Sequence, residues 1–319
     1  MSKMNPLVSI IVPAYNCANY VVQTLDSVFA QDYLAKQVIV VNDGSKDHTL
    51  EVLKQFADRI TLIDQSNAGP AAARNAGLTA ATGDYIAFVD ADDIWLKRKL
   101  TAQVACLTAN PEVVAVFTDW QVWRPDGAGR FVLPETWNIP VSDDVNTAAS
   151  GWLYTRLLLD CVMQTSGVMM RAALRRKLGD FDPTLSSGED YDFWLRLSRE
   201  GQITKLASVG VLYRVLPNSV SRSVHSKNFE FQVLQRSLGR WGPSGPDGTR
   251  VDQFALERRL DNLQLTHAHS HLHHGNPRIA LAVYRDVAAR HPTQIKLWLN
   301  AARAAMKALR KPKAPVGAV

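Results

Sequence analysis

Four short apolar runs, each followed by polar residues and then by a helix-like pattern, open the chain. The runs are residues 8–12, 38–41, 60–63 and 85–89. Between them, apolar positions recur every three or four residues, as across residues 21–29, which is the spacing of amphipathic helices. Strands that alternate with helices predict a mostly parallel sheet with helices on both faces. We therefore expect an α/β fold.

Polar residues gather directly after three of the four predicted strands. They occupy residues 13–16 (PAYN), 42–45 (NDGS) and 90–93 (DADD). Parallel strands end at the same edge of a sheet, and ligands of such sheets bind beyond the carboxyl ends of the strands. These three segments are therefore predicted to share one crevice.

The segment after the fourth run contains three carboxylates in four positions, those of Asp90, Asp92 and Asp93. Neighbouring carboxylates repel one another, and a divalent cation that prefers oxygen ligands, Mg²⁺ or Mn²⁺, relieves the repulsion. A metal held by one or two carboxylates usually completes its shell with substrate phosphates. The alternative interpretation is a solvated loop in which Asp93 caps a helix over residues 94–108.

Taken in order, these segments resemble glycosyltransferase family 2. The resemblance is carried by VSIIVPAYN, VIVVNDGSKDHT, NAGPAAARNAGLTAATGDYIAFVDADD and, downstream, GEDYDFWLRLSREG. Each motif is weak evidence by itself, whereas four in series are strong. The resemblance covers about residues 6–220. It implies the Rossmann-like GT-A fold and inverting transfer of a sugar from a nucleotide diphosphate sugar.

The resemblance also implies a set of donor-binding residues. Those that would line the nucleotide pocket are Pro13, Tyr15, Asp43, Arg74 and Asp90. Asp43 would accept a hydrogen bond from the uracil ring, and Arg74 would lie near the base or the phosphates. Asp90 and Asp92 would hold the Mn²⁺ or Mg²⁺ ion that bridges the diphosphate. From the residues alone, Asp43 can equally begin an Asx turn, and Arg74 can be a solvated arginine.

A second acidic segment, residues 187–192, leads into an amphipathic helical pattern. Acidic side chains at a helix N-terminus are favourable through the helix dipole, and this alone accounts for the pattern. The resemblance implies that Asp190 is the catalytic base for an acceptor hydroxyl and that Glu189 is an acceptor-side or supporting carboxylate. Asp192 is expected to point elsewhere. Farther along, Arg214 is a candidate phosphate partner.

Charge divides the chain into two parts. Residues 1–220 contain 20 Lys+Arg and 24 Asp+Glu, whereas residues 221–319 contain 16 and 6. We predict a GT-A catalytic domain over residues 1–220 and a small basic helical region over residues 221–319. Within the catalytic domain, residues 6–118 are expected to bind the nucleotide sugar. Residues 119–220 are expected to form the acceptor side.

Cysteine usage and hydropathy predict the compartment. Three scattered cysteines favour a reducing cytosol over a disulfide framework. The chain shows no signal peptide and no apolar run of ~18 residues, so we expect a cytoplasmic protein. The basic region lacks the interleaved aromatic residues of a nucleic-acid site, and no nucleic-acid partner is expected.

The C-terminal residues 301–319 contain five Lys or Arg and no acid. One interpretation is a solvated helical face. A second is weak attachment to anionic lipid at the inner face of the membrane, where each basic residue contributes ~1 kcal/mol. A third is that Leu297, Trp298 and Met306 belong to a helix that simply packs on the C-terminal region.

Two functions from different classes follow. The first is an active glycosyltransferase that uses a UDP-sugar or a related donor. Its acceptor would be a glycan or a lipid-linked sugar, in the synthesis of surface polysaccharide or another glycan. The second is a non-catalytic nucleotide-sugar-binding or scaffold protein on the same fold. The presence of both carboxylate sets, at Asp92 and at Asp190, favours the enzyme. The donor sugar, the acceptor, the linkage and the oligomeric state stay open.

Overall fold

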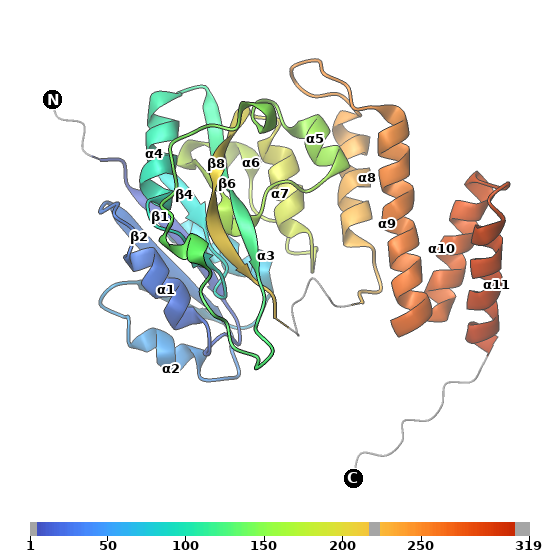
Figure 1. Cartoon of the computed structure of the whole chain (residues 1–319), viewed down its shortest axis with the longest axis horizontal. Coiled ribbons are helices and arrows are strands. Elements are labelled where there is room, and N and C mark those ends of the chain that lie inside the picture. Colours follow the sequence, from blue (N-terminus) through green and yellow to red (C-terminus); the bar gives the residue numbers. More distant parts are fainter. Residues whose placement is uncertain (1–4, 217–223, 310–319) are drawn as a thin grey trace, which may run out of the picture.

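The core is one eight-stranded sheet, seen in a computed structural model that describes residues 5–216 and 224–309 (Figure 1). The strand order is β3-β2-β1-β4-β7-β6-β8-β5. The strands are β1 Val8–Ala14, β2 Lys36–Asp43, β3 Thr61–Gln65, β4 Tyr85–Phe88, β5 Ile94–Trp95, β6 Val113–Trp123, β7 Met169–Arg171 and β8 Gln202–Arg214. Among these, β7 and β5 run antiparallel to their neighbours, and all other pairs are parallel.

Helices cover both faces of this sheet. Those of the first 216 residues are α1 Val21–Phe29, α2 Thr49–Lys54, α3 Pro70–Ala80, α4 Lys99–Ala109, α5 Tyr154–Leu159, α6 Arg175–Leu178 and α7 Glu189–Leu197. Ile10 and Ile11, adjacent on β1, belong to two different apolar clusters, because side chains along a strand alternate between its faces. The first cluster includes α1 and α4, and the second includes α5 and α7. The predicted mostly parallel sheet with helices on both faces is confirmed.

One predicted element is wrong. Residues 94–108 do not form a single helix, because Ile94–Trp95 are the edge strand β5 and α4 begins at Lys99. Strand β5 pairs antiparallel with β8, a partner more than 100 residues away that local periodicity cannot reveal. Asp93 therefore does not cap α4, whose N-cap is Arg98.

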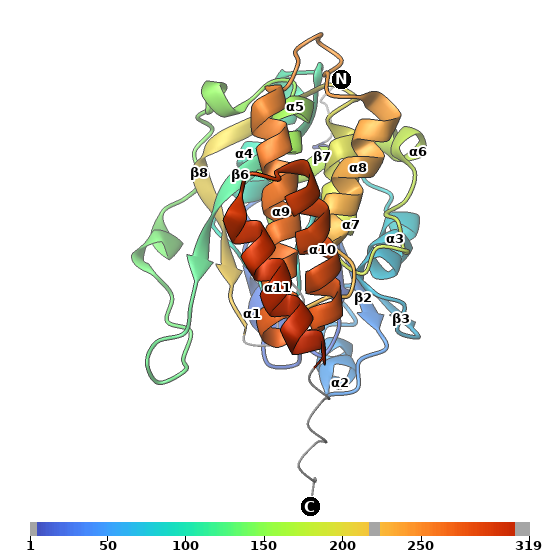
Figure 2. The same cartoon turned by 90° about the vertical axis from the view of Figure 1, so that its right-hand side faces the viewer.

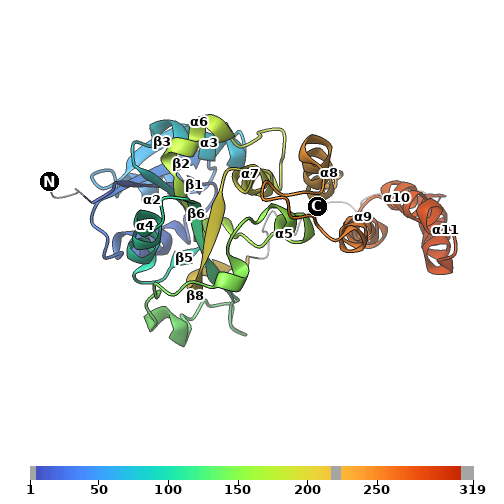
Figure 3. The ribbon, with the colours of Figure 1, turned by 90° about the horizontal axis from the view of Figure 1, so that it is seen from above.

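Four further helices follow the sheet: α8 Phe229–Trp241, α9 Gln253–His274, α10 Pro277–Arg290 and α11 Ile295–Leu309. Val233 of α8 and Leu256 of α9 belong to the same apolar cluster as α7, so these two helices share the core of the sheet. By contrast, α10 and α11 pack on the C-terminal half of α9 and lie at the far end of the molecule (Figures 1 and 3). The predicted domain boundary at residue 220 lies in the segment 217–223, outside the described residues.

Close packing of α3 on β1 depends on Gly77. A Cβ atom at Gly77 would lie 2.4 Å from Cγ2 of Ile11. We expect Gly77→Ala to lower the free energy of unfolding by roughly 1–3 kcal/mol, because the added methyl group overpacks the core.

A matched control is Gly239 of α8, where an added Cβ meets no atom within 4 Å. Gly239→Ala should stabilise the protein by up to about 1 kcal/mol, because alanine is the better helix former. Urea unfolding of both variants measures the difference. Equal effects would show that α3 does not approach β1 this closely.

Candidate active site

The carboxyl ends of β1, β2 and β4 lie at one edge of the sheet, because these three strands are adjacent and parallel. The polar segments 13–16, 42–45 and 90–93 therefore meet at the same edge, as expected. The backbone N–H of Asn16 donates to Oγ of Ser45 at 3.0 Å, which links the first two segments directly.

Arg74 of α3 joins the aspartate segment to the acidic helix α7. Its buried guanidinium donates to Oδ1 of Asp90 at 2.8 Å and to Oε1 of Glu189 at 2.6 Å. Burial acts to lower the pKa of Arg74, but Asp90, Glu189 and Asp190 outweigh it and hold that pKa above its usual value. A permanently charged side chain thus holds together two acidic segments that are distant in sequence.

A short 3-10 turn, Thr165–Gly167, also contacts both acidic segments. Oγ1 of Thr165 donates to Oδ2 of Asp190 at 2.7 Å, and the backbone N–H of Asp90 donates to Oγ of Ser166 at 3.0 Å. Sequence reasoning missed this turn. The letters TSG carry no signal of chemistry, and only the tertiary fold brings the turn between β4 and α7.

The neighbouring aspartates at the end of β4 have different surroundings. Asp93 is buried and accepts hydrogen bonds from Gln164, Ser166 and the backbone N–H of Arg214, so its carboxylate is tied into the fold. Asp92 accepts no side-chain hydrogen bond from another residue in the described ranges 5–216 and 224–309. Burial, together with repulsion from Asp90, raises the pKa of Asp92 to about 6.

The pair Asp90 and Asp92 fits a divalent cation of the Mg²⁺ type. Both supply hard carboxylate oxygens, and a cation would relieve the repulsion that disfavours the charged form of Asp92. Within the part of the chain that the structure describes, no group of three His, Cys, Asp or Glu side chains could hold a metal. Mg²⁺ is usually bound through one or two carboxylates, with phosphate or water completing its shell.

Asp43 at the end of β2 organises the loop that precedes α3. Its Oδ1 accepts from Nε2 of Gln65 at 2.7 Å and from the backbone N–H of Ala68 at 2.9 Å, and Oδ2 accepts from the backbone N–H of Gly69 at 2.8 Å. A carboxylate has about four acceptor positions, so one remains for a ligand N–H. The structural role of Asp43 is therefore visible, while its contact with a base stays a prediction.

The other predicted nucleotide residues differ in exposure. Tyr15 is 46% exposed at the carboxyl end of β1, and Pro13 is half-buried beside it. Arg74 is buried and paired with the carboxylates of Asp90 and Glu189, and its Nε has no hydrogen-bond partner among the described residues. Its position near a base or the phosphates stays a prediction.

Arg214, the candidate phosphate partner, anchors the end of β8 to the aspartate segment. Its guanidinium donates to the carbonyl oxygen of Asp92 at 2.7 Å and to Oε1 of Gln23 at 2.8 Å. It also lies 4.3 Å from the ring centroid of Trp123 and 4.7 Å from that of Phe131. Arg214 is therefore buried within the protein, and its hydrogen bond to the backbone of Asp92 restrains the aspartate turn.

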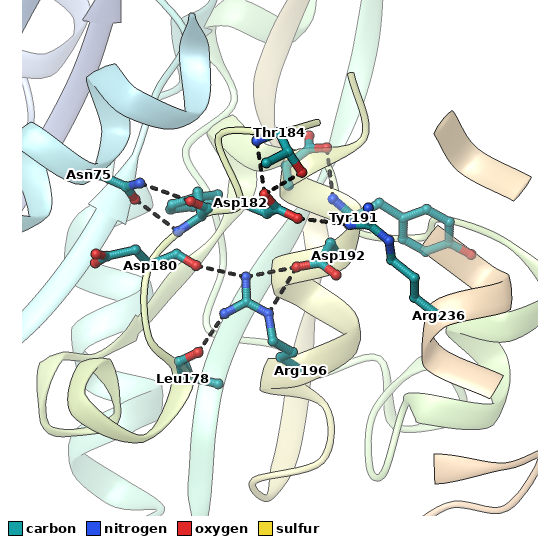
Figure 4. Close-up of polar contacts among 11 residues, drawn as sticks. Asn75, Leu178, Asp180, Asp182, Thr184, Tyr191, Asp192, Arg196 and Arg236 are labelled. Carbon is teal, nitrogen blue, oxygen red and sulfur yellow. Dashed lines mark hydrogen bonds and ion pairs between the residues drawn. The ribbon is translucent and has the colours of Figure 1, made fainter. Parts of the chain in front are cut away.

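The acidic helix α7 is held in place on its outer side by Arg196 (Figure 4). Arg196 forms an ion pair with Asp192 at 2.8 Å and donates to the carbonyl oxygens of Leu178 and Asp180. The carboxylate of Asp192 is thus engaged in the structure, which agrees with the expectation that it points away from Asp190.

Hydrogen bonds from α3 and an ion pair from α8 fix the turn that precedes α7. The side-chain amide of Asn75 donates to the carbonyl oxygen of Phe181 and accepts from the N–H of Phe181, both at 2.8 Å (Figure 4). Arg236 of α8 forms an ion pair with Asp182 at 2.8 Å. These contacts set the position at which α7 begins, and so the positions of Glu189 and Asp190.

Comparison with known proteins agrees with this geometry. The glycosyl transferase family 2 model matches residues 9–139 of the chain. A UDP-Glc:α-D-GlcNAc-diphosphoundecaprenol β-1,3-glucosyltransferase of Escherichia coli is 30% identical over 236 residues, which cover 72% of this chain and 83% of that protein. The chain belongs to glycosyltransferase family 2.

Solved structures support the fold of this glycosyltransferase. Residues 1–349 of S. aureus TarS in complex with UDP-GlcNAc give a TM-score of 0.62 at 19% identity, over 95% of this chain and 89% of that one. The mannosyltransferase PcManGT of Pyrobaculum calidifontis, in complex with GDP-Man and Mn²⁺, gives a TM-score of 0.61 at 20% identity, over 98% and 89%. The expected GT-A fold is thereby confirmed.

In metal-free buffer, the free energy of unfolding of the glycosyltransferase should contain a component that falls as pH rises from about 4 to about 6. Because the pKa of Asp92 is about 6 when folded and 3.8 ordinarily, the folded state holds more protons than the unfolded state in this window. Asp92→Asn should remove the share of this component that comes from Asp92, while buried Asp93, whose pKa is also raised, keeps its own share. The variant should be roughly 1–3 kcal/mol more stable than the wild type at pH 7.

Urea unfolding at pH 4 and pH 7 measures this component. Asp58→Asn, an exposed change of the same charge, should behave like the wild type. A pH dependence that is unaltered in Asp92→Asn would show that Asp92 is not the group that titrates.

Proposed function

We propose that this glycosyltransferase is an inverting enzyme that moves a sugar from a nucleotide diphosphate sugar, with a UDP-sugar as the expected donor, to an acceptor hydroxyl. The observation that carries the proposal is the Arg74 bridge. It holds Asp90, on the expected donor side, against Glu189, and Asp190 follows Glu189 in the chain. A displacement reaction needs the diphosphate leaving group and the base in one site, and this bridge supports that arrangement.

The names of related proteins support the donor class. The E. coli relative is named for UDP-Glc, TarS is in complex with UDP-GlcNAc, and PcManGT is in complex with GDP-Man. We assign Pro13, Tyr15 and Asp43 to the nucleotide. Tyr15 offers an exposed ring for stacking, and Asp43 retains one acceptor position for a ring N–H.

We assign Asp90 and Asp92 to a divalent cation, Mn²⁺ or Mg²⁺. When bound, such a cation offsets the negative charge that develops on the leaving nucleoside diphosphate. The side chains around the site prepare it for this role. Arg74 restrains Asp90 through Oδ1, and Arg214 holds the backbone of Asp92 in place.

We assign the role of catalytic base to Asp190. Its carboxylate is partly exposed and is oriented by Thr165, whereas Glu189 is buried against Arg74 and is therefore a positioning residue. Asp190 accepts the proton of the acceptor hydroxyl while that oxygen attacks the anomeric carbon. The bond from this carbon to the diphosphate oxygen breaks in the same displacement. The configuration inverts, and no covalent enzyme intermediate forms.

We propose a glycan or a lipid-linked sugar as the acceptor, in the synthesis of surface polysaccharide or another glycan. The E. coli relative is named for an acceptor on diphosphoundecaprenol. A hollow of about 380 Å³ lies between Ser187, just before the acidic helix, and the facing parts of α8 and α9. It is bordered by Asn228, Glu230 and Arg259, whose polar groups suit sugar hydroxyls. Ser187 borders this hollow from the expected acceptor side, residues 119–220, and the other bordering residues belong to the C-terminal region.

UDP and Mn²⁺ together should raise the melting temperature more than either ligand alone. Asp92 and the diphosphate of UDP would share the metal ion, and at a ligand concentration 100-fold above its Kd the linkage gives about 2.7 kcal/mol. Differential scanning fluorimetry with each ligand and with both measures the effect. Asp92→Asn should keep the shift produced by UDP and lose the increment from Mn²⁺. Equal wild-type shifts with and without Mn²⁺ would contradict the metal assignment.

Asp190→Asn should lower kcat by ~10²-fold or more and leave UDP binding almost unchanged, because the amide matches the carboxylate in size but takes no proton. Release of UDP from the donor in the presence of acceptor measures kcat. Asp192→Asn is the matched control, with the same change of charge on the same helix. It should keep turnover, since Asp192 is paired with Arg196. Near-normal turnover in Asp190→Asn would assign the base to another carboxylate.

A further inference from the structure

Helix α11 is the outermost helix of the protein (Figures 1 and 2). It carries apolar residues on two opposite faces. Its inner face packs on α9 and α10 through Leu297, Ala301 and Ala304, all buried. The large apolar side chains on its outer face are Ile295, Trp298, Leu299, Met306 and Leu309, each 44–85% exposed. A helix on the surface of a globular protein normally keeps its apolar residues on the side of the core.

These exposed residues form one continuous stripe. At about 100° per residue, they fall within an arc of roughly 100° opposite the buried face. Single exposed apolar residues are ordinary, whereas a contiguous patch marks a contact surface. We call this stripe the α11 surface. Its tryptophan is the residue type that proteins place at the boundary between lipid and water.

Basic groups border the α11 surface on one side. Lys296, Arg303 and Lys307 lie next to the stripe on the same helix. On α9, His269 and His273 line a hollow of about 490 Å³ together with Arg303, Met306 and Lys307. Between residues 262 and 309 there are six Lys or Arg and only one acid, Asp286. This acid pairs with Arg290 at 3.2 Å, and Asp261, just before this range, pairs with the same arginine. The other five Lys and Arg side chains leave this end of the molecule cationic.

We propose that the α11 surface docks on an anionic lipid bilayer. Apolar side chains can enter the boundary of the acyl chains while the adjacent Lys and Arg side chains stay near lipid phosphates. A lipid surface matches both parts of the α11 surface, since it offers apolar chains to the stripe and anionic phosphates to Lys296 and Arg303. No helix within residues 5–216 and 224–309 is long and apolar enough to cross a membrane.

The α11 surface also reconciles the sequence-based interpretations of this region. Leu297 packs inward, as a docked helix requires, but Trp298 and Met306 are exposed. Helix α11 therefore packs on the C-terminal region and also exposes apolar side chains to solvent. Of the five basic residues counted between 301 and 319, three lie outside the described residues: Arg310, Lys311 and Lys313. The α11 surface includes none of those three.

Co-sedimentation of the full chain with vesicles tests the proposal. The wild type should bind phosphatidylcholine vesicles that contain phosphatidylglycerol, and not phosphatidylcholine alone. Trp298→Ser with Met306→Ser should weaken binding at least tenfold, because both apolar anchors are lost. Lys296→Gln with Arg303→Gln should also weaken it tenfold or more, at about fivefold per basic residue, and make binding less sensitive to salt.

Matched controls remove side chains of the same kind elsewhere. Leu34→Ser changes an apolar residue that is 86% exposed on the catalytic part, and Lys54→Gln with Arg176→Gln removes two exposed charges there. Both should bind vesicles like the wild type. All variants should keep the wild-type melting temperature and the wild-type response to UDP, because the changed side chains are exposed and lie away from the aspartate segment.

Three results would overturn the proposal. The first is unchanged vesicle binding in Trp298→Ser with Met306→Ser. The second is binding that depends on the basic residues alone. The third is a wild-type dimer that dissociates in the Trp298→Ser, Met306→Ser variant without any vesicle binding, which would assign the surface to a second copy. Because the response to UDP is measured separately, failure of the vesicle test leaves the proposed transfer reaction untouched.

Discussion

The site depends on one buried cation. Arg74 has almost no contact with solvent, so its charge is tolerated only because Asp90 and Glu189 neutralise it from two sides. Removing one partner of such a buried pair typically costs about 3–5 kcal/mol, because the remaining charge stays buried. Arg74 therefore works as a link between the aspartate turn after β4 and the start of α7. The position of Asp190 follows from that link and from its hydrogen bond with Thr165.

The three carboxylates of the aspartate turn have different partners. Asp90 neutralises Arg74, and Asp93 accepts hydrogen bonds from Gln164, Ser166 and the backbone of Arg214. Asp92 forms no ion pair and accepts no side-chain hydrogen bond among the described residues, and burial together with Asp90 raises its pKa to about 6. Burial and the neighbouring carboxylates Asp92 and Asp90 also raise the pKa of Asp93, but that carboxyl group is committed to hydrogen bonds within the fold. Asp92 is therefore the perturbed carboxylate that a bound cation could relieve. Perturbed groups of this kind gather at functional sites because ligands supply the missing partner.

The C-terminal helices serve two different parts of the molecule. Helices α8 and α9 complete the apolar core beside α7, and Arg236 of α8 holds the turn that positions α7. Helices α10 and α11 extend away from the sheet and expose an apolar and basic surface. The N-terminal helices of the basic C-terminal region, α8 and α9, therefore support the proposed acceptor side, whereas its last helix carries the α11 surface.

The sequence by itself determined the strands β1 to β4, the helices between them and the edge where polar residues meet, because periodicity and strand-end chemistry are local properties. It did so for the segments 13–16, 42–45 and 90–93. Only the tertiary structure placed β5 beside β8, the turn Thr165–Gly167 between the acidic segments, and Glu189 in a buried pair with Arg74. Each of these depends on contacts between residues more than 20 positions apart, and most span more than 70. Such contacts leave no local pattern, since they are decided by how the finished elements pack.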